Sequence, residues 1–149
     1  MKTGTTIRRL SAEDTSLFRS VLRLFEDAFD GPSGADLPED YLHSLLQGRT
    51  LSVFVSLQEN RVIGALTAYL MPSYYSKKPF LYLMDIAVAE PHQRQGVGSG
   101  LLAALLEYGR EVGADEMFVQ ADLEDTHAID FYHKNGGEAA SVVHFTYPL

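Results

Sequence analysis

The 149-residue sequence contains no cysteine, which excludes disulfides, thiolate metal sites and a cysteine nucleophile. Basic residues are also scarce: 12 Lys and Arg stand against 20 Asp and Glu, a net charge of −8. Nucleic-acid binding needs clustered Lys and Arg, so this balance argues against nucleic acid as a partner. An acidic cleft would concentrate a cationic substrate, although an ordinary solvated acidic surface explains the charge more simply.

Long apolar runs are missing as well. No stretch approaches the ~20 residues that a membrane-spanning helix requires, and the segment 1–6 lacks the apolar core of a signal peptide. We therefore expect a cytoplasmic protein that does not associate with a membrane. The composition, 46% hydrophobic, is that of an ordinary globular chain. At this length we expect residues 1–149 to form a single domain with a substantial core.

The hydrophobic periodicity predicts six strands and four helices. The expected strands are 5–10, 50–57, 62–71, 80–88, 117–121 and 141–147, and the expected helices are 18–29, 38–47, 97–112 and 128–134. This order favours a mixed sheet with helices on both faces, an α/β (α+β) fold. The short apolar strand 117–121 suits a central position in that sheet. Gly64, inside a strand, indicates a bulge or a close approach.

A glycine-rich segment follows the strand 80–88 and opens a helix, with Gly96, Gly98 and Gly100 at alternate positions. Helix N-termini present unpaired N–H groups and a partial positive charge that suit phosphate. Glycine lets the backbone approach a ligand closely. The third glycine of a dinucleotide fingerprint would stand at 101, where the chain has Leu101. A helix entry without any ligand is the simple alternative.

One carboxylate, Asp85, interrupts the apolar strand 80–88. Strict alternation would put it on one face with Leu81, Leu83 and Ala87. A carboxylate among apolar neighbours is costly, which points to a function. A hydrogen-bonded structural aspartate is the alternative.

A metal site is not expected. The five histidines have no spacing typical of a zinc site. The acidic segment that begins at Asp122 has His127 at the sixth position, where a calcium-binding loop requires glycine.

Residues 93–98 in the glycine-rich segment, and residues 128–136 with the aromatic pair Phe131-Tyr132, resemble the two signatures of the GCN5-related N-acetyltransferase (GNAT) superfamily. Residues 93–98 read Gln-Arg-Gln-Gly-Val-Gly, which is similar to the Gln/Arg-x-x-Gly-x-Gly/Ala loop after the fourth strand of that family. Residues 128–136 contain the aromatic pair Phe131-Tyr132 and a downstream glycine, as in the second signature. The resemblance implies the GNAT fold, a mixed central sheet of about six to seven strands with helices on both faces, and acetyl-CoA as cosubstrate.

Within the superfamily, the segments 64–69, 82–88, 119–122 and 144–145 resemble class I aminoglycoside 3-N-acetyltransferases, the gentamicin-acetylating type. That class transfers an acetyl group to the 3-amino group of an aminoglycoside antibiotic and confers resistance. The resemblance implies direct attack by the amine within a ternary complex, without an acyl-enzyme.

The resemblance also implies roles for individual residues. Asp85 would be the general base, acting directly or through water, and would hold the substrate ammonium; Tyr132 would be the general acid. Substrate-binding residues would be Asp85, Asp122, Asp125 and Tyr75, although Tyr75 could equally cover the sheet. The expected cofactor-binding residues are Ile86, Ala87, Val88, Gln93, Arg94, Gln95, Gly96, Val97, Gly98, Ser99, Phe131 and Tyr132.

Two other functions stay open from the sequence. The chain could acetylate a different amine, such as a peptide N-terminus, lysine, polyamine or small metabolite, with Asp85 and Tyr132 in the same roles. It could also bind acyl-CoA without catalysis. Homodimers are common in the superfamily, and the predicted C-terminal strand with Phe145 and Tyr147 could contribute to one.

Overall fold

A computed structural model describes residues 4–149, so the first three residues of the segment compared with a signal peptide lie outside it. The chain forms two compact units, one ending at Val119 and one comprising Gln120–Leu149. No helix within the described residues has both the length and the apolar character needed to cross a bilayer.

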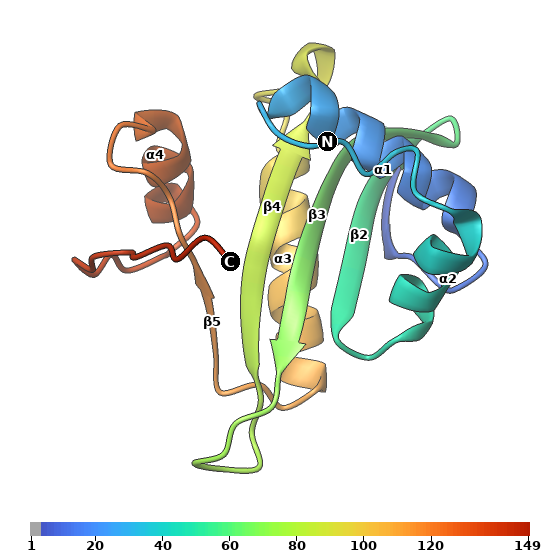
Figure 1. Cartoon of the computed structure of the whole chain (residues 1–149). Coiled ribbons are helices and arrows are strands. Elements are labelled where there is room, and N and C mark those ends of the chain that lie inside the picture. Colours follow the sequence, from blue (N-terminus) through green and yellow to red (C-terminus); the bar gives the residue numbers. More distant parts are fainter. Residues whose placement is uncertain (1–3) are drawn as a thin grey trace. The chain divides into compact units, whose positions relative to one another are not determined.

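The first unit is a five-stranded sheet with helices on both faces. Its strands follow the order β1-β2-β3-β4-β5, and all neighbours are antiparallel except β4 and β5, which are parallel. The strands are β1 (Thr5–Arg9), β2 (Leu51–Gln58), β3 (Arg61–Met71), β4 (Phe80–Val88) and β5 (Glu116–Val119); the helices are α1 (Thr15–Ala28), α2 (Glu39–Gln47), α3 (Val97–Glu111) and the 3-10 turn η1 (Glu90–His92). Helices α1 and α2 cover one face and α3 covers the other (Figure 1). The predicted mixed sheet is confirmed.

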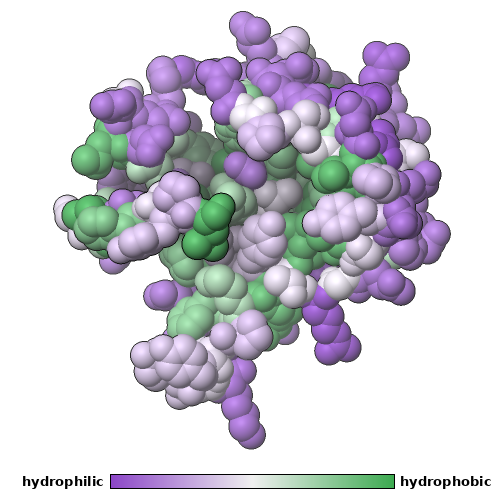
Figure 2. Space-filling view, in the orientation of Figure 1, coloured by the Kyte–Doolittle hydropathy of each residue, from purple (hydrophilic) through white to green (hydrophobic). Residues whose placement is uncertain are grey.

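Apolar side chains on alternate strand positions build the core between the sheet and α1 and α2. Phe18 and Val21 of α1 and Leu42 of α2 pack with Val53 of β2 and Ala65 of β3. On α1 the buried residues Thr15, Phe18 and Val21 are three residues apart, which is the spacing of one buried helical face. The outer surface over α1 is mainly hydrophilic (Figure 2).

The opposite face of the sheet packs against α3, and Gly64 makes this contact close. A Cβ at Gly64 would lie 2.9 Å from Val97 Cγ1 and 3.2 Å from Leu101 Cδ1, both on α3. The register between β2 and β3 also shifts beside this glycine, after Ser56. Both predicted meanings of Gly64, a bulge and a close approach, are therefore confirmed. The small residue lets the start of α3 lie directly on β3.

The second unit contains one helix, α4 (Thr126–Lys134), within residues 120–149. The side chain of Asp125 caps it by accepting a hydrogen bond from the Ala128 N–H at 3.0 Å. The strand expected at 141–147 is absent from the described structure, so that prediction is wrong. The side chains of this segment are exposed, among them Val142, Val143, Phe145 and Tyr147. Alternating apolar residues make a strand only where a partner accepts their backbone hydrogen bonds.

The sheet consequently has five strands in the described residues, fewer than the six to seven expected. Strand β5, expected at the centre, lies at the edge and pairs only with β4. The remaining predicted helices and strands occur where the sequence places them, to within three residues at each end.

Candidate active site

A β-bulge in β4 decides where Asp85 lies. Asp85 is opposite Thr67 of β3, but Leu83 is opposite Ala68, so two steps along β4 correspond to one step along β3. Residues paired across two strands point to the same face of the sheet, whereas the consecutive residues Thr67 and Ala68 point to different faces. Asp85 therefore lies on the other face from Leu83. The expectation that Asp85 shares a face with Leu81 and Leu83 is wrong, because Met84 is the extra residue that reverses the alternation.

Asp85 lies on the face of the sheet that α1 and α2 cover. Its neighbour on β3, Thr67, is two residues from the core residue Ala65 and so points to the same face as Ala65. The side chain is half-buried, and this burial raises the pKa of its carboxyl group. Within residues 4–149 the carboxylate has no hydrogen-bond or ion-pair partner. A half-buried carboxylate with a raised pKa and no partner is typical of a functional group rather than a structural one.

The edge of β4 beyond Asp85 leaves backbone groups without a strand partner. Pairing with β5 stops at Leu83. Ala89 donates its N–H to the carbonyl oxygen of Ile63 in β3 at 2.9 Å. Strand alternation then directs the backbone groups of Val88 and Ile86 away from β3, to the edge that β5 does not pair with. These two N–H groups are thus positioned to donate to a ligand.

The loop between η1 and α3 has a backbone shape that the sequence only partly suggests. Gly96 adopts a left-handed conformation with φ of 82°, as glycine readily does, but Arg94 does so as well, with φ of 59°. Side-chain hydrogen bonds brace this loop: Gln93 Nε2 donates to the Val88 carbonyl at 3.0 Å and Gln95 Nε2 donates to the Pro91 carbonyl at 2.9 Å. The side chain of Gln93 thus ties the loop to the end of β4.

The first turn of α3 offers unpaired N–H groups. The hydrogen bond from Gly100 N to the Gly96 carbonyl, at 2.9 Å, begins the helix, and no side chain in the described part of the chain caps this end. The N–H groups of Val97, Gly98 and Ser99 therefore lack an acceptor within the helix. Together with the partial positive charge of the helix end, they fit a pyrophosphate.

In the second unit, α4 carries Phe131 and Tyr132 with their rings edge to face, 5.2 Å between centroids. Both side chains are partly buried. Asp125 uses its carboxylate to cap α4, so one oxygen is already engaged, whereas Asp122 lies exposed in the preceding turn.

Tyr75 lies in the loop between β3 and β4. This loop precedes Phe80, whereas Asp85 lies beyond the middle of β4 and the glycine-rich loop follows its far end. Tyr75 packs on Tyr74, with 4.2 Å between ring centroids and 3.0 Å between the two hydroxyls, and both are strongly exposed. The structure therefore does not bring Tyr75 to Asp85.

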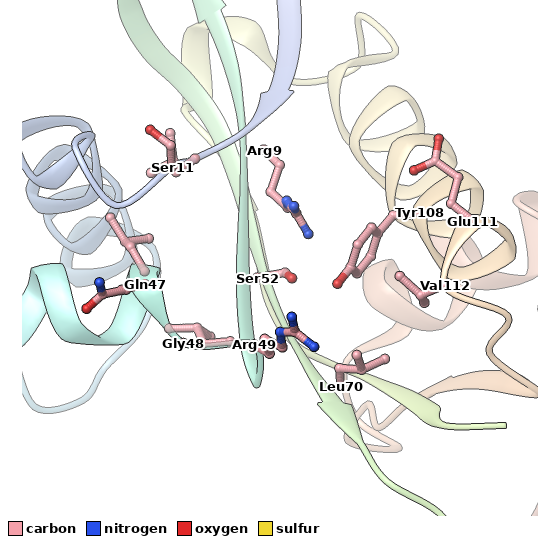
Figure 3. Close-up of a pocket in the computed structure, with 13 residues that line it drawn as sticks. Arg9, Ser11, Gln47, Gly48, Arg49, Ser52, Leu70, Tyr108, Glu111 and Val112 are labelled. Atoms are coloured by element: carbon pink, nitrogen blue, oxygen red, sulfur yellow. The ribbon is translucent and has the colours of Figure 1, made fainter. Parts of the chain in front are cut away.

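Sequence reasoning missed a cavity of about 610 Å³ at the other end of the sheet (Figure 3). None of the predicted site residues lines it. Arg9 of β1, Arg49 after α2 and Tyr108 of α3 meet there, although they are far apart in the sequence. No local pattern signals a cavity of this kind.

A mixed sheet whose β4 carries a half-buried carboxylate and leads through a glycine-rich loop into the uncapped start of α3 is an arrangement that suits a phosphorylated ligand. The family model described as the acetyltransferase (GNAT) family matches residues 18–137. The chain belongs to the GNAT family and is an N-acetyltransferase.

The solved structures most similar to the chain include two aminoglycoside acetyltransferases from uncultured soil metagenomic samples. One, meta-AAC0020, was solved with trehalose and with sisomicin; the trehalose complex is 38% identical, covers 99% of this chain and 98% of that one, and has a TM-score of 0.89. The other, HMB0005, is 30% identical over 100% of this chain and 99% of that one, with the same TM-score.

Curated relatives are more distant. The N-alpha-acetyltransferase of Sulfurisphaera tokodaii is 29% identical over 126 residues, which is 74% of this chain and 73% of that protein. The match to rat N-acetyltransferase 8 is 24% identical and spans 56% of that protein's length.

Proposed function

We propose that this N-acetyltransferase transfers the acetyl group of acetyl-CoA to the 3-amino group of an aminoglycoside and thereby confers resistance. The observation that carries the proposal is the 38% identity, over nearly the whole of both chains, to an aminoglycoside acetyltransferase solved with sisomicin. The unpaired, half-buried carboxylate of Asp85 supports it, because an aminoglycoside presents several ammonium groups.

Asp85 holds the substrate ammonium and accepts a proton from it, directly or through one water. Its ordinary pKa of ~3.9 is low for a base near neutral pH. Burial raises that pKa, which makes the carboxylate a better proton acceptor. The amine, once neutral, attacks the thioester carbonyl carbon. A C–N bond forms, the C–S bond breaks, Tyr132 protonates the departing thiolate, and the second proton lost by the nitrogen returns through water to the Tyr132 oxygen.

The backbone around the glycine-rich loop holds the cosubstrate. The N–H groups from Arg94 to Ser99, including those of Gln95, Gly96, Val97 and Gly98, donate hydrogen bonds to the pyrophosphate oxygens. Gln93 stabilises this loop through its bond to Val88. The edge residues Ile86, Ala87 and Val88 line the acetyl-bearing arm, where the N–H groups of Ile86 and Val88 polarise the thioester carbonyl.

Tyr132 is the general acid of the proposal, and Phe131 contributes to the cosubstrate site. A phenol with an ordinary pKa of ~10 stays protonated near neutral pH and can donate to the departing thiolate. Tyr132→Phe tests this role: the hydroxyl is lost and the ring is kept. We expect kcat to fall about 10²-fold or more while the dissociation constant for CoA changes little. Unchanged kcat would remove Tyr132 from the reaction.

Asp122 and Asp125 are the proposed acidic contacts for further ammonium groups of the acceptor. Asp122 is exposed, and the second oxygen of Asp125 is not used by the helix cap. A contact from Tyr75, in the loop before Phe80, requires an acceptor that extends along β4. A homodimer stays a prediction.

The test is acetyl-CoA-dependent release of free thiol with sisomicin and gentamicin, followed by identification of the acetylated nitrogen in the product by NMR. Turnover with acetylation at the 3-amino group supports the proposal. Acetylation at another amino group would leave an aminoglycoside acetyltransferase of different regiochemistry. No turnover on either antibiotic, with turnover on peptides or polyamines, would overturn it.

A second candidate is acetylation of a peptide N-terminus. The 29% identity to the N-alpha-acetyltransferase of Sulfurisphaera tokodaii favours it. Asp85 and Tyr132 would keep their roles, since a peptide α-amino group must also lose a proton. Short peptides with different first residues, assayed beside sisomicin under the same conditions, discriminate the two acceptors by their kcat/KM values.

A further inference from the structure

The cavity missed by sequence reasoning has the character of a binding site. It lies where the end of β1, the start of β2, the end of β3 and the last turn of α3 meet. A second hollow of about 440 Å³ adjoins it, and the two share Arg49, Leu70 and Val112. Leu10, Leu46, Leu51, Leu70 and Val112 give the larger cavity apolar walls.

Positive charge gathers in this cavity although the chain as a whole carries −8. Arg9 and Arg49 line the larger hollow and Lys77 lines the smaller one. Within the described residues, neither arginine forms an ion pair with a carboxylate. Unpaired guanidinium groups are the side chains best suited to hold carboxylate or phosphate, because their N–H donors form a planar fork.

The donors in the cavity are held in position. The guanidinium of Arg9 lies over the ring of Tyr108, 4.7 Å from its centroid, and that ring also contacts Phe54. This cation–π contact restrains the guanidinium without using its N–H groups as donors to an oxygen acceptor.

Two hydroxyl groups complete the set. In Figure 3 the guanidinium of Arg9, the hydroxyl groups of Ser52 and Tyr108, and the guanidinium of Arg49 point into the same space. Ser52 is buried, at 4% exposure, so its hydroxyl faces the cavity rather than bulk water. The carboxylate of Glu111 points away from these donors in the same view.

We propose that this cavity binds a small organic oxyanion, a carboxylate or a phosphate ester, at a site separate from the acetyl-transfer site. Arg9 and Arg49 neutralise the anion, Ser52 and Tyr108 donate to it, and the apolar walls contact its carbon skeleton. Glycine-rich loop and cavity lie at opposite ends of α3, whose 15 residues span about 22 Å. A small oxyanion bound in the cavity therefore cannot also reach the glycine-rich loop.

The experiment separates this cavity from the phosphate-binding glycine-rich loop by saturating the loop first. The full chain, labelled with ¹⁵N and saturated with CoA, is titrated with glucose 6-phosphate in one arm and succinate in another, and amide shifts are followed by NMR. We expect saturable shifts at Arg9, Gly48, Arg49 and Ser52 in at least one arm. The arm that saturates at the lower concentration distinguishes phosphate from carboxylate.

Three variants complete the test. Arg9→Gln and Arg49→Gln are each expected to weaken binding roughly tenfold or more, because each loses a charged donor. Arg23→Gln, an exposed arginine on α1 outside the cavity, is the matched control and should bind as the parent does. A melting curve shows that each variant is folded.

Either of two results would overturn the proposal: no saturable shift in either arm, or equal binding by the Arg9→Gln, Arg49→Gln and parent proteins. Acetyl transfer does not enter this readout. Failure of the proposed aminoglycoside activity would therefore leave the outcome at the cavity unaffected.

Discussion

Asp85 of β4 lies directly opposite Thr67 of β3, on the face of the sheet that α1 and α2 cover. The residue between Leu83 and Asp85, Met84, has no counterpart on β3, and this single insertion reverses the faces of the strand from that point. Thr67 is buried at 7% exposure, and Asp85 beside it is half-buried, with no hydrogen-bond or ion-pair partner for its carboxylate among residues 4–149. The bulge thus converts a strand residue into an available carboxylate.

The first prediction concerns catalysis by Asp85. Asp85→Asn keeps the shape of the side chain and removes its basicity, so kcat/KM should fall by about 10²- to 10⁴-fold. In the parent, the rate should decline as pH falls through the raised pKa of Asp85, and this acid limb should vanish in the variant. Steady-state thiol release across pH measures both effects.

Asp115→Asn is the matched control for that measurement, since Asp115 is exposed and its backbone N–H bonds to Pro79, before the start of β4. Its pH profile should coincide with that of the parent. An unaltered acid limb in Asp85→Asn would mean that another group is the base.

The second prediction concerns stability. Because burial raises the pKa of Asp85, the folded protein keeps this proton at pH values where the unfolded chain has lost it. The carboxyl therefore costs no stability below its ordinary pKa of about 3.9, and stability falls as pH rises from there through the raised pKa. Asp85→Asn should raise Tm at neutral pH and leave it unchanged below about pH 4. Equal Tm values at neutral pH would show that the ionised carboxylate is not penalised.

The third prediction concerns Gly64, on which α3 rests. In Gly64→Ala the new Cβ would meet Val97 Cγ1 at 2.9 Å and the Ala87 carbonyl oxygen at 3.3 Å. Since the backbone of β4 cannot readily retreat, we expect a loss of about 1–3 kcal/mol in urea unfolding. CoA should also bind more weakly, because the first turn of α3 is displaced.

Gly31→Ala provides the comparison for Gly64→Ala, because no described residue other than its chain neighbours lies within 4 Å of a Cβ at Gly31. Its stability should stay within about 0.5 kcal/mol of the parent. If both variants unfold alike, the contact between β3 and α3 is not the cause.

The fourth prediction concerns the link between β1 and α1. Arg8 donates two hydrogen bonds of 2.8 Å to Asp14, which also accepts from the N–H and hydroxyl of Ser11. The Arg8 guanidinium holds the pKa of Asp14 well below its usual range. The stabilisation that the ionised Asp14 carboxylate gives the fold is complete above about pH 3.9, and it is lost as pH falls toward the lowered pKa of Asp14.

Asp14→Ala should therefore lower the free energy of unfolding by about 1–2 kcal/mol at neutral pH and by less at acid pH. Urea unfolding at neutral and at acid pH measures the two losses. The arginine is 40% exposed, so water screens part of the ion pair. Glu107→Ala removes the exposed pair with Arg110 on α3 and should cost about 0.5 kcal/mol or less. Equal losses in the two variants would contradict the prediction.

Most of the fold follows from patterns within short segments. Phe18 and Val21 repeat at helical spacing, and the glycines from 96 to 100 mark the start of α3, so these elements could be predicted from the sequence. The failures involve pairing between distant segments. Residues 141–147 alternate as a strand would, but no partner strand pairs with them in the described structure.

The sequence by itself determined the local chemistry of this N-acetyltransferase: a carboxylate in a strand, a glycine-rich turn and an aromatic pair on a short helix. Only the tertiary structure decided that Asp85 shares a face with Thr67 and not with Leu83, and that Arg9, Arg49 and Tyr108 enclose one cavity. The physical reason is that helix propensity and turn geometry act over a few residues, whereas strand register and cavity walls depend on residues tens of positions apart.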